Sequence, residues 1–221
     1  QHNEAERYYQ EAMKRFGREL DAPTRAGTLN NLGNLQNKKN EFEDALKSYK
    51  EALEIYSKLA QSNPQTYLPD VAGSLNNLGA LQYKKNEFED ALKSFKEALE
   101  IRRKLAQANS QTYLPDVAGS LNNLGILQKN KNEFEDALKS FKEALKIYRK
   151  LAQSNPQTYL PDVAMTLNNL SIFYQESQPD KDVSVQYAME ALKILTPFLE
   201  RVPDTQQYAQ RARQVLQDWG V

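Results

Sequence analysis

Apolar and polar residues follow the spacing of amphipathic α-helices along most of the chain. After residue 86, apolar side chains recur at steps of three, four and seven residues, with one turn skipped. One apolar stripe of this kind predicts a helix of about 20 residues with a single buried face. The stripe consists of Phe88, Ala91, Leu92, Phe95, Ala98, Leu99 and Leu105. No segment alternates with a period of two residues for long, so the pattern predicts no β-sheet.

A shorter helix is predicted just before this one, from about Pro69 to Tyr83. Pro69 suits a first helical turn, where its missing N–H costs nothing, and Asp70 complements the positive end of the helix dipole. We predict that Asn86 caps the longer helix, because Glu89 three residues later completes a capping box. The apolar residues of the shorter helix also have helical spacing; they are Val71, Leu75, Leu78, Gly79 and Leu81.

This pair of helices recurs every 46 residues. The string QTYLPDVAGSLNNLG begins at residues 65 and 111, and its relative QTYLPDVAMTLNNLS begins at residue 157. The string NEFEDALKS begins at residues 40, 86 and 132. A repeat of this length predicts helical hairpins that bury a shared core by stacking on their neighbours. The Asn-Pro-Gln-Thr stretch at residues 63–66 and its copies are predicted to be loops between hairpins.

Leucine, small and aromatic residues hold fixed places in each pair of helices. They are Leu29, Leu32, Gly33, Ala45, Tyr49 and Ala52; Leu75, Leu78, Gly79, Ala91, Phe95 and Ala98; and Leu121, Leu124, Gly125, Ala137, Phe141 and Ala144. This pattern resembles the tetratricopeptide repeat. The resemblance implies an all-α fold, a right-handed α-α superhelix of antiparallel helix hairpins with about ten helices. The Pro-Asp-Val-Ala and Leu-Asn-Asn-Leu segments, in a repeat longer than the usual 34 or so residues, resemble kinesin light chains and their bacterial and archaeal relatives.

We predict one array over residues 1–221. Gln1 lies just before what reads as the middle of a repeat, so residues 3–20 are expected to be the orphan second helix of a truncated repeat. In the last repeat Ala188 replaces the aromatic residue, and Pro197 should kink or end the helix. Repeats are expected at residues 24–62, 67–109, 113–155 and 159–200, the last of them divergent, and a polar capping helix at residues 204–219.

Composition narrows the classes of function. The chain has 29 basic and 29 acidic residues and no cysteine. A net charge of zero argues against binding of nucleic acid or acidic membranes by bulk charge. No apolar run approaches the roughly 20 residues that span a bilayer. A mean hydropathy of -0.76 suits an elongated array. We therefore expect a cytoplasmic protein with neither membrane nor nucleic acid as partner.

Catalytic motifs are not found in the sequence. The only histidine is His2, and no glycine-rich phosphate loop or Cys/His metal motif occurs. The acidic cluster at residues 41–44 could suggest paired carboxylates, but charge at a helix start is the favoured reading. The Lys-rich stretches before each second helix could form a basic ridge or a solvated face, and the second is favoured. We expect no enzyme, no cofactor and no metal.

Two adjacent asparagines stand in the middle of every first helix. Asn is a mediocre helix former, so such a pair requires a reason. By resemblance, first helices line the concave groove of tetratricopeptide arrays, where amides of kinesin-light-chain-like repeats hold a cargo peptide. Alternatively, one amide of each pair bonds to the neighbouring repeat and stiffens the stack. On spacing, we assign Asn30, Asn76, Asn122 and Asn168 to the groove and the second asparagine of each pair to the stack.

Other groove positions differ between repeats. Four residues beyond the groove asparagines lie Asn34, Ala80, Ile126 and Ile172, and three residues further lie Asn37, Tyr83, Lys129 and Gln175. These residues suggest a gradient from a polar N-terminal to a more apolar C-terminal end, which would set specificity. Drift at tolerant surface sites is the alternative.

The leading hypothesis is therefore a scaffold that binds a protein or an extended peptide in its groove. A second hypothesis is a regulatory or sensor segment of a larger protein, as the resemblance implies for arrays attached to signalling ATPases or caspase-like proteases. A third is a module that associates with itself through its N-terminal end.

Overall fold

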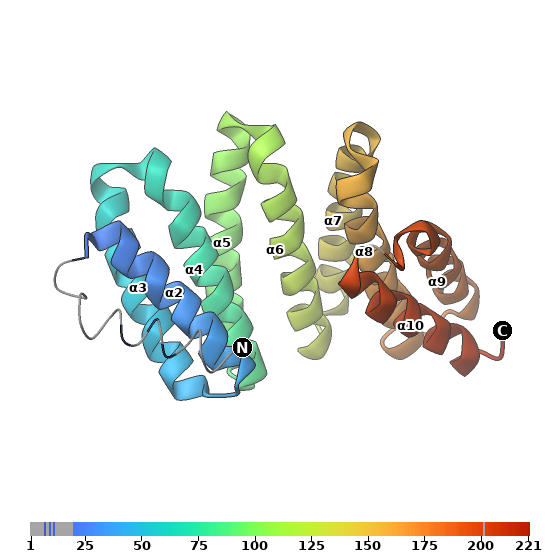
Figure 1. Ribbon diagram of the computed structural model, residues 1–221. Coiled ribbons are helices and arrows are strands. Elements are labelled where there is room, and N and C mark those ends of the chain that lie inside the picture. Colours follow the sequence, from blue (N-terminus) through green and yellow to red (C-terminus); the bar gives the residue numbers. More distant parts are fainter. Residues whose placement is uncertain (1–6, 8, 10, 12–19, 201) are drawn as a thin grey trace. The chain divides into compact units, whose positions relative to one another are not determined.

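Helices make up nearly all of the computed structural model, which describes residues 7, 9, 11, 20–200 and 202–221 (Figure 1). No β-strand occurs within these residues, in agreement with the sequence pattern. The orphan helix predicted at residues 3–20 lies almost entirely outside them. The chain divides into two compact units, at residues 1–108 and 109–221.

Two helical hairpins form the described part of unit 1. Figure 1 shows that the two helices of a hairpin run side by side in opposite directions. The second helices are as long as the apolar stripe predicts, with 21 residues each. The helices are α2 (Ala22–Lys38), α3 (Phe42–Ser62), α4 (Pro64–Lys84) and α5 (Phe88–Ala108).

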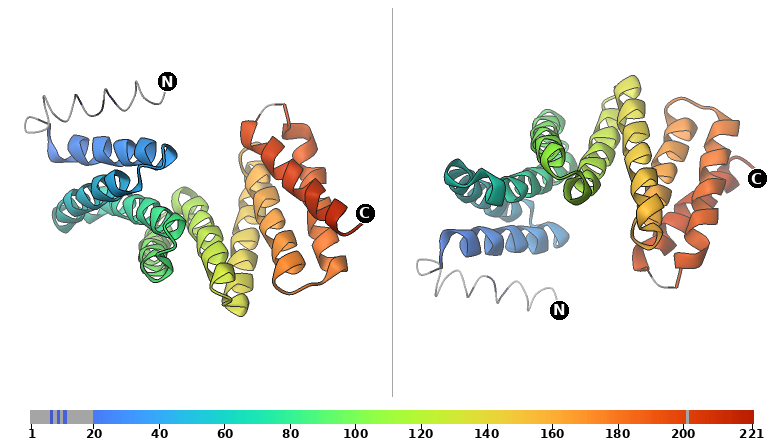
Figure 2. Two further views of the ribbon diagram at one scale, coloured as in Figure 1. Left: turned by 90° about the horizontal axis from the view of Figure 1, so that it is seen from below. Right: turned by 90° about the horizontal axis from the view of Figure 1, so that it is seen from above.

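Unit 2 contains two more hairpins and a final helix. The final helix packs against both helices of the preceding hairpin, as the views of Figure 2 show. The elements are α6 (Ser110–Asn130), α7 (Phe134–Ser154), α8 (Pro156–Glu176), α9 (Lys181–Leu195), a 3-10 turn (Thr196–Phe198) and α10 (Pro203–Asp218).

A glycine facing an aromatic ring closes each of the first three hairpins. A Cβ atom placed on Gly79 would lie 2.8 Å from Cδ1 of the Phe95 ring. Such a distance is shorter than a van der Waals contact, so the two helices can approach this closely only because one residue has no side chain. Gly33 faces Tyr49 and Gly125 faces Phe141 in the same way, each with a nearest distance of 2.7 Å. The small and aromatic residues of the repeat pattern therefore hold each hairpin together.

The last hairpin closes on two serines instead. Ser171 replaces the glycine, and its hydroxyl donates to the carbonyl oxygen of Ser184 at 2.8 Å. The Ser184 hydroxyl donates back to the carbonyl oxygen of Ser171 at 2.8 Å. Ala188 stands at the aromatic position, as the sequence predicts, and is fully buried, while Phe173 of α8 packs edge-on against Phe141 of the preceding helix α7.

The first helix of a repeat begins earlier than predicted. Helix α4 starts at Pro64 rather than at about Pro69, and the side chain of Asn63 accepts a hydrogen bond from the backbone N–H of Thr66 at 3.3 Å. Asn before the helix and Pro in its first turn are start signals, although the same residues also mark loops. The stretch predicted as a loop is therefore a cap and a first turn. The copies at Asn109 and Asn155 cap α6 and α8 alike.

The predicted capping box at Asn86 is wrong. Asn86 has a positive φ of 61° and terminates α4 instead of capping α5. Its N–H donates to the carbonyl of Tyr83, and the N–H of Glu87 donates to the carbonyl of Gln82 at 2.9 Å. This pair of bonds is a Schellman motif, which needs a left-handed residue, and Asn tolerates that conformation better than most residues. Asn40 and Asn132 have the same conformation.

The last helices lie around Pro197 and Pro203. Helix α9 stops at Leu195, two residues before Pro197, and Thr196–Phe198 continue as a 3-10 turn. Proline has no N–H to donate and its ring clashes with the preceding helical turn, so the α-helix cannot continue through Pro197 unchanged. Helix α10 buries Ala209, Ala212 and Val215 and exposes glutamine and arginine side chains on its other face. This polar outer face is of the kind expected of a capping helix.

Two glycines of α6 provide a matched test of the hairpin contact. Gly125→Ala should lower the free energy of unfolding by about 1–3 kcal/mol, since the new methyl group overlaps the Phe141 ring. Gly119→Ala should raise it by up to about 1 kcal/mol, because Ala is the better helix former and the new Cβ atom meets only the Tyr148 hydroxyl, at 3.5 Å. Urea unfolding of both variants measures the two effects, and shifts of the same sign would contradict the account.

Candidate functional site

The first asparagine of each pair links neighbouring first helices. In unit 1, Nδ2 of Asn30 on α2 donates to the hydroxyl of Ser74 on α4 at 2.8 Å. The Ser74 hydroxyl donates in turn to the backbone carbonyl of Asp70 at 2.9 Å. This relay fixes the register between the two helices, because the hydroxyl both accepts and donates.

Unit 2 repeats this relay. Nδ2 of Asn122 donates to the hydroxyl of Thr166 at 2.8 Å, and that hydroxyl donates to the carbonyl of Asp162. In the last hairpin, Nδ2 of Asn168 donates to the backbone carbonyl of Tyr208 on α10, also at 2.8 Å. Helix α10 thus offers a backbone acceptor, where Ser74 and Thr166 offer a hydroxyl.

These bonds favour the stack role for three residues that spacing assigned to the groove. Asn122 and Asn168 are only 2% exposed, and Asn30 and Asn76 are half-buried. The Oδ1 atoms of Asn30, Asn122 and Asn168 are buried and have no hydrogen-bond partner. The serine and threonine partners were missed by sequence reasoning, although Ser74 and Thr166 stand 44 residues after the asparagines that they bind. A contribution of these amides to ligand binding stays a prediction.

Three of the other predicted groove residues also join first helices. Asn37 accepts from Nζ of Lys84 at 2.9 Å, and Lys129 pairs with Glu176 at 2.7 Å. Gln175 donates to the carboxylate of Asp218 on α10 at 3.0 Å. These side chains lie at the C-terminal ends of α2, α6 and α8, where they tie each helix to the next.

The remaining predicted residues lie at various depths. Asn34 is exposed and accepts from the Tyr49 hydroxyl at 2.7 Å, and the ring of Tyr83 packs 5.9 Å from that of Phe88. Ala80, Ile126 and Ile172 are half-buried. Ile126 and Ile172 occupy equivalent positions of α6 and α8, which contact each other in unit 2. They give this pair of first helices two partly exposed aliphatic side chains.

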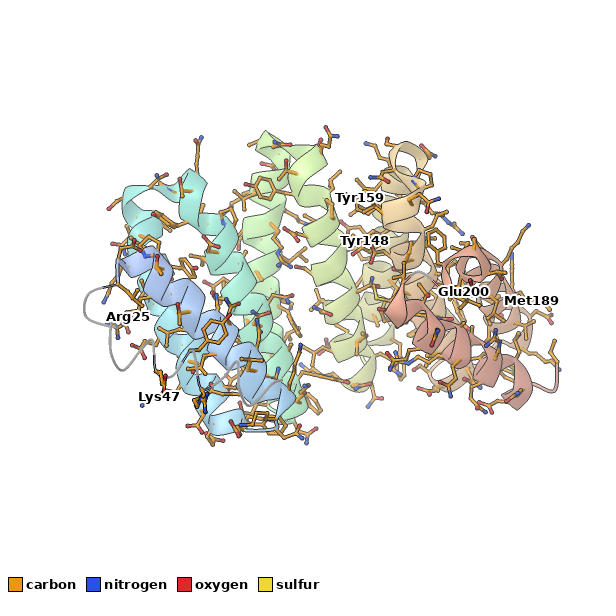
Figure 3. All side chains as sticks on the ribbon, in the orientation of Figure 1. Arg25, Lys47, Tyr148, Tyr159, Met189 and Glu200 are labelled. Atoms are coloured by element: carbon orange, nitrogen blue, oxygen red, sulfur yellow. The ribbon has the colours of Figure 1, made fainter. Side chains whose placement is uncertain are left out.

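Tyr67 and Tyr159 lie in the first turns of the first helices α4 and α8. The Tyr67 ring lies 6.5 Å from that of Tyr56 and packs against the core of unit 1. In unit 2, Tyr159 lines a pocket of about 490 Å³ together with Ser110, Gln111, Leu114, Lys150, Leu151, Ser154 and Asn155. Figure 3 labels Tyr159 of α8 and Tyr148 of α7.

Two aspartates of the first helices have perturbed acidity. Burial raises the pKa of Asp162 to about 6, and it raises the pKa of Asp70 as well. The pKa of the Tyr56 hydroxyl is raised by burial first and then by the negative charge of Asp70. Neither carboxyl has a basic side chain among the causes of its shift. Within the described part of the chain no helix is long and apolar enough to cross a membrane, and no cluster of potential metal ligands occurs.

Comparison with known proteins agrees with this architecture. Models of the tetratricopeptide repeat match residues 1–58, 72–105 and 117–157. No curated protein matches the chain significantly in sequence.

Several solved structures share the fold. BtubC (BKLC) from P. vanneervenii is 23% identical, with a TM-score of 0.69 over 100% of this chain and 88% of that chain. The apo form of RapI is 16% identical, with a TM-score of 0.69 over 95% of this chain and 75% of that one. Aspartyl phosphate phosphatase F from Bacillus subtilis is also 16% identical, with a TM-score of 0.69 over 96% and 53%. At these identities the likeness shows the fold alone.

Stacked hairpins with glycine–aromatic contacts and a polar cap define a helical-repeat scaffold for protein interaction. The chain belongs to the tetratricopeptide-repeat proteins, and its repeats recur every 46 residues.

The relay between first helices can be tested at Asn122. Asn122→Ala removes the bond to Thr166 and should lower the free energy of unfolding by about 1–2 kcal/mol. Chemical denaturation measures this loss, and Gln153→Ala, at an exposed position of α7, is the control. An Asn122→Ala variant as stable as the control would show that the bond does not hold the stack.

The raised pKa of Asp162 predicts a pH dependence. The folded chain holds this proton more tightly than the unfolded chain, so the free energy of unfolding falls as pH rises from about 4 to about 6, and the cost is fully present above that. Asp162→Asn should remove the fall and stabilise the protein at pH 7 by about 1 kcal/mol, once screening by solvent is allowed for. Unfolding of wild type, Asp162→Asn and the exposed control Asp136→Asn between pH 4 and 7 measures it. Parallel curves for wild type and Asp162→Asn would refute the prediction.

Proposed function

We propose that this chain binds an extended segment of a partner protein along the first-helix face of its hairpins. The observation that carries the proposal is the pair of half-buried isoleucines, Ile126 and Ile172, at the same position of two adjacent first helices. Aliphatic side chains that stay partly exposed on neighbouring helices offer apolar contacts to a ligand side chain.

Residues that close the hairpins recur between the repeats, whereas a residue on the first-helix face varies, and this difference supports a binding role. Residues that close the hairpins recur almost unchanged from one repeat to the next, as Gly33, Gly79 and Gly125 illustrate. By contrast, the position of Ile126 is occupied by Asn34, Ala80 and Ile172 in the other repeats. The fold accommodates a polar, a small and a large apolar residue at this position. The residue there can therefore contribute to ligand specificity without disturbing the hairpin.

Buried amide oxygens supply a second support. The Oδ1 atoms of Asn122 and Asn168 lack a partner, and an unpaired buried acceptor costs roughly 1–3 kcal/mol. Both asparagines lie four residues, about one helical turn, before Ile126 and Ile172. Because both residues are only 2% exposed, the amide would have to turn outward, away from its partner in the stack, before a backbone N–H of a bound segment could satisfy the oxygen. Peptide binding in this form uses the same amides that hold the stack.

A regulatory or sensor role within a larger protein, and self-association through the N-terminal end, are alternative proposals. Neither is favoured by a specific contact of the described residues. Tetratricopeptide hairpins generally serve as a non-catalytic scaffold, which agrees with a binding role rather than an enzymatic one.

Selection of displayed peptides tests the proposal. A library of random linear 12-residue peptides is selected on the purified chain, and the affinities of the selected peptides are measured by calorimetry. Ile126→Ser and Ile172→Ser should each weaken binding about tenfold, since each removes a contact worth about 1.5 kcal/mol or more. Ile147→Ser, at a half-buried position of the second helix α7, is the control and should leave the affinity unchanged. Peptides that bind all three variants equally, or a library that yields no binder, would contradict the proposal.

A further inference from the structure

The second helix α7 of unit 2 carries a row of exposed lysines along one face. They are Lys139, Lys142, Lys146 and Lys150. Steps of three, four and four residues keep the four side chains within about 80° around the helix, along about 16 Å of its axis. Exposed Glu135 precedes the row and half-buried Glu143 flanks it. Within the part of the chain that the structure describes, none of the four ammonium groups forms a hydrogen bond or an ion pair.

One substitution sets α7 apart from the second helices of unit 1. In α3, Glu54 holds Lys58 one turn later, with 2.6 Å between Oε1 and Nζ. The equivalent pair in α5 has a distance of 2.7 Å. Helix α7 has Lys146 at the position of these glutamates. Lys150 therefore lacks the partner that its counterparts have, and the row is not interrupted by a carboxylate.

The row ends at a pocket between the start of α6, the end of α7 and the start of α8. The pocket has a volume of about 490 Å³, and among the described residues that line it Lys150 alone is charged. Half-buried Leu114, Leu151 and Tyr159 form the apolar part of the wall. Ser110 adds a hydroxyl where α4 and α8 begin with a proline. This lining suits a bulky apolar side chain that lies next to a negative charge.

We propose that the lysine row and this pocket form a second docking surface, which binds an acidic segment of a protein. Carboxylates of the segment pair with the lysines, and one large apolar side chain of the segment occupies the pocket. Opposite charges set the register of such a contact, and the buried apolar side chain supplies affinity. Ile126 lies 12 residues beyond Leu114, about 18 Å along α6, so this surface is separate from the first-helix contact proposed above and does not rest on it.

Two other polyanions match the surface less well. A protein that lies on an anionic membrane inserts apolar side chains next to its basic ones. Within the described residues, however, the large hydrophobic side chains that are exposed are Met189 and Val221, both outside α7. Duplex DNA carries one charge per 1.7 Å or so, which gives about nine phosphate charges along the row against four lysines. A protein segment uses both the lysines and the apolar pocket.

The experiment uses a library of 12-residue peptides, each with several aspartates or glutamates and one leucine, phenylalanine or tryptophan. Peptides selected on the purified chain are labelled, and their affinities are measured by fluorescence anisotropy. Lys142→Glu and Lys146→Glu should each weaken binding about tenfold, since a repelling charge replaces an attracting one. Lys50→Glu, at the exposed position of α3 that corresponds to Lys142, is the control and should bind like wild type.

Two changes in the peptide locate its contacts. Amides in place of its carboxylates should weaken binding to the wild-type chain about tenfold, with a smaller effect on the Lys142→Glu and Lys146→Glu variants. Benzoylphenylalanine in place of its apolar residue should form photo-crosslinks to Leu114, Leu151 or Tyr159, which mass spectrometry identifies. Because α3 and α5 carry glutamate at the position of Lys146, the Lys146→Glu variant should keep the melting temperature of wild type.

The inference is overturned if the library yields no binder, if both α7 variants bind like Lys50→Glu, or if the crosslinks lie outside the pocket. Phosphatidylserine vesicles or a duplex oligonucleotide that bind more tightly than the best peptide, and lose this binding in Lys146→Glu, would also overturn it. Ile126→Ser and Ile172→Ser should bind the acidic peptides like wild type. Loss of binding in these two variants alone would overturn the second surface and leave the proposed function standing.

Discussion

The close approach of a glycine to an aromatic ring is the contact on which the other features of each hairpin depend. Because Gly79 lies against Phe95, the two helices are near enough for Ala91 and Ala98 to be fully buried. The apolar stripe of the second helix therefore packs against the first helix. The same glycine–aromatic contact recurs in the first three hairpins. Positions that differ between the repeats are therefore not required to hold the two helices of a hairpin together. The last hairpin also brings its two helices close together, but with different residues. Ser171 and Ser184 hydrogen-bond to each other, and Ala188 stands at the aromatic position.

Neighbouring hairpins are held together by hydrogen bonds, in addition to the apolar contacts within each hairpin. The relay from Asn122 through Thr166 to a backbone carbonyl ties one first helix to the next, and Asn168 extends it to the capping helix. The same asparagines keep an unpaired oxygen. Stack and recognition are therefore coupled in our account, because a ligand that engages these oxygens acts on the groups that set the register.

The repeat period, the hairpins and the length of the second helices could be predicted from the sequence, because periodic apolar residues record which face is buried. The residues at which helices begin and end were harder to predict. Asn63 and Pro64 begin a helix although they also suit a loop, and Asn86 takes a left-handed conformation although it suits a cap. For the site, the sequence identified the asparagine row but not which partner each amide has. The burial of Asp70 and Asp162, which raises the pKa of both carboxyl groups, was missed entirely, since burial is a property of the assembled helices.

Isoleucine methyl NMR offers the most direct test of peptide binding along the first helices. The chain has six isoleucines, of which Ile126 and Ile172 lie on first helices and Ile55, Ile101, Ile147 and Ile194 on second helices. On titration with a selected peptide, the account predicts that the methyl signals of Ile126 and Ile172 shift while the other four stay in place. Shifts confined to the isoleucines of the second helices would contradict it.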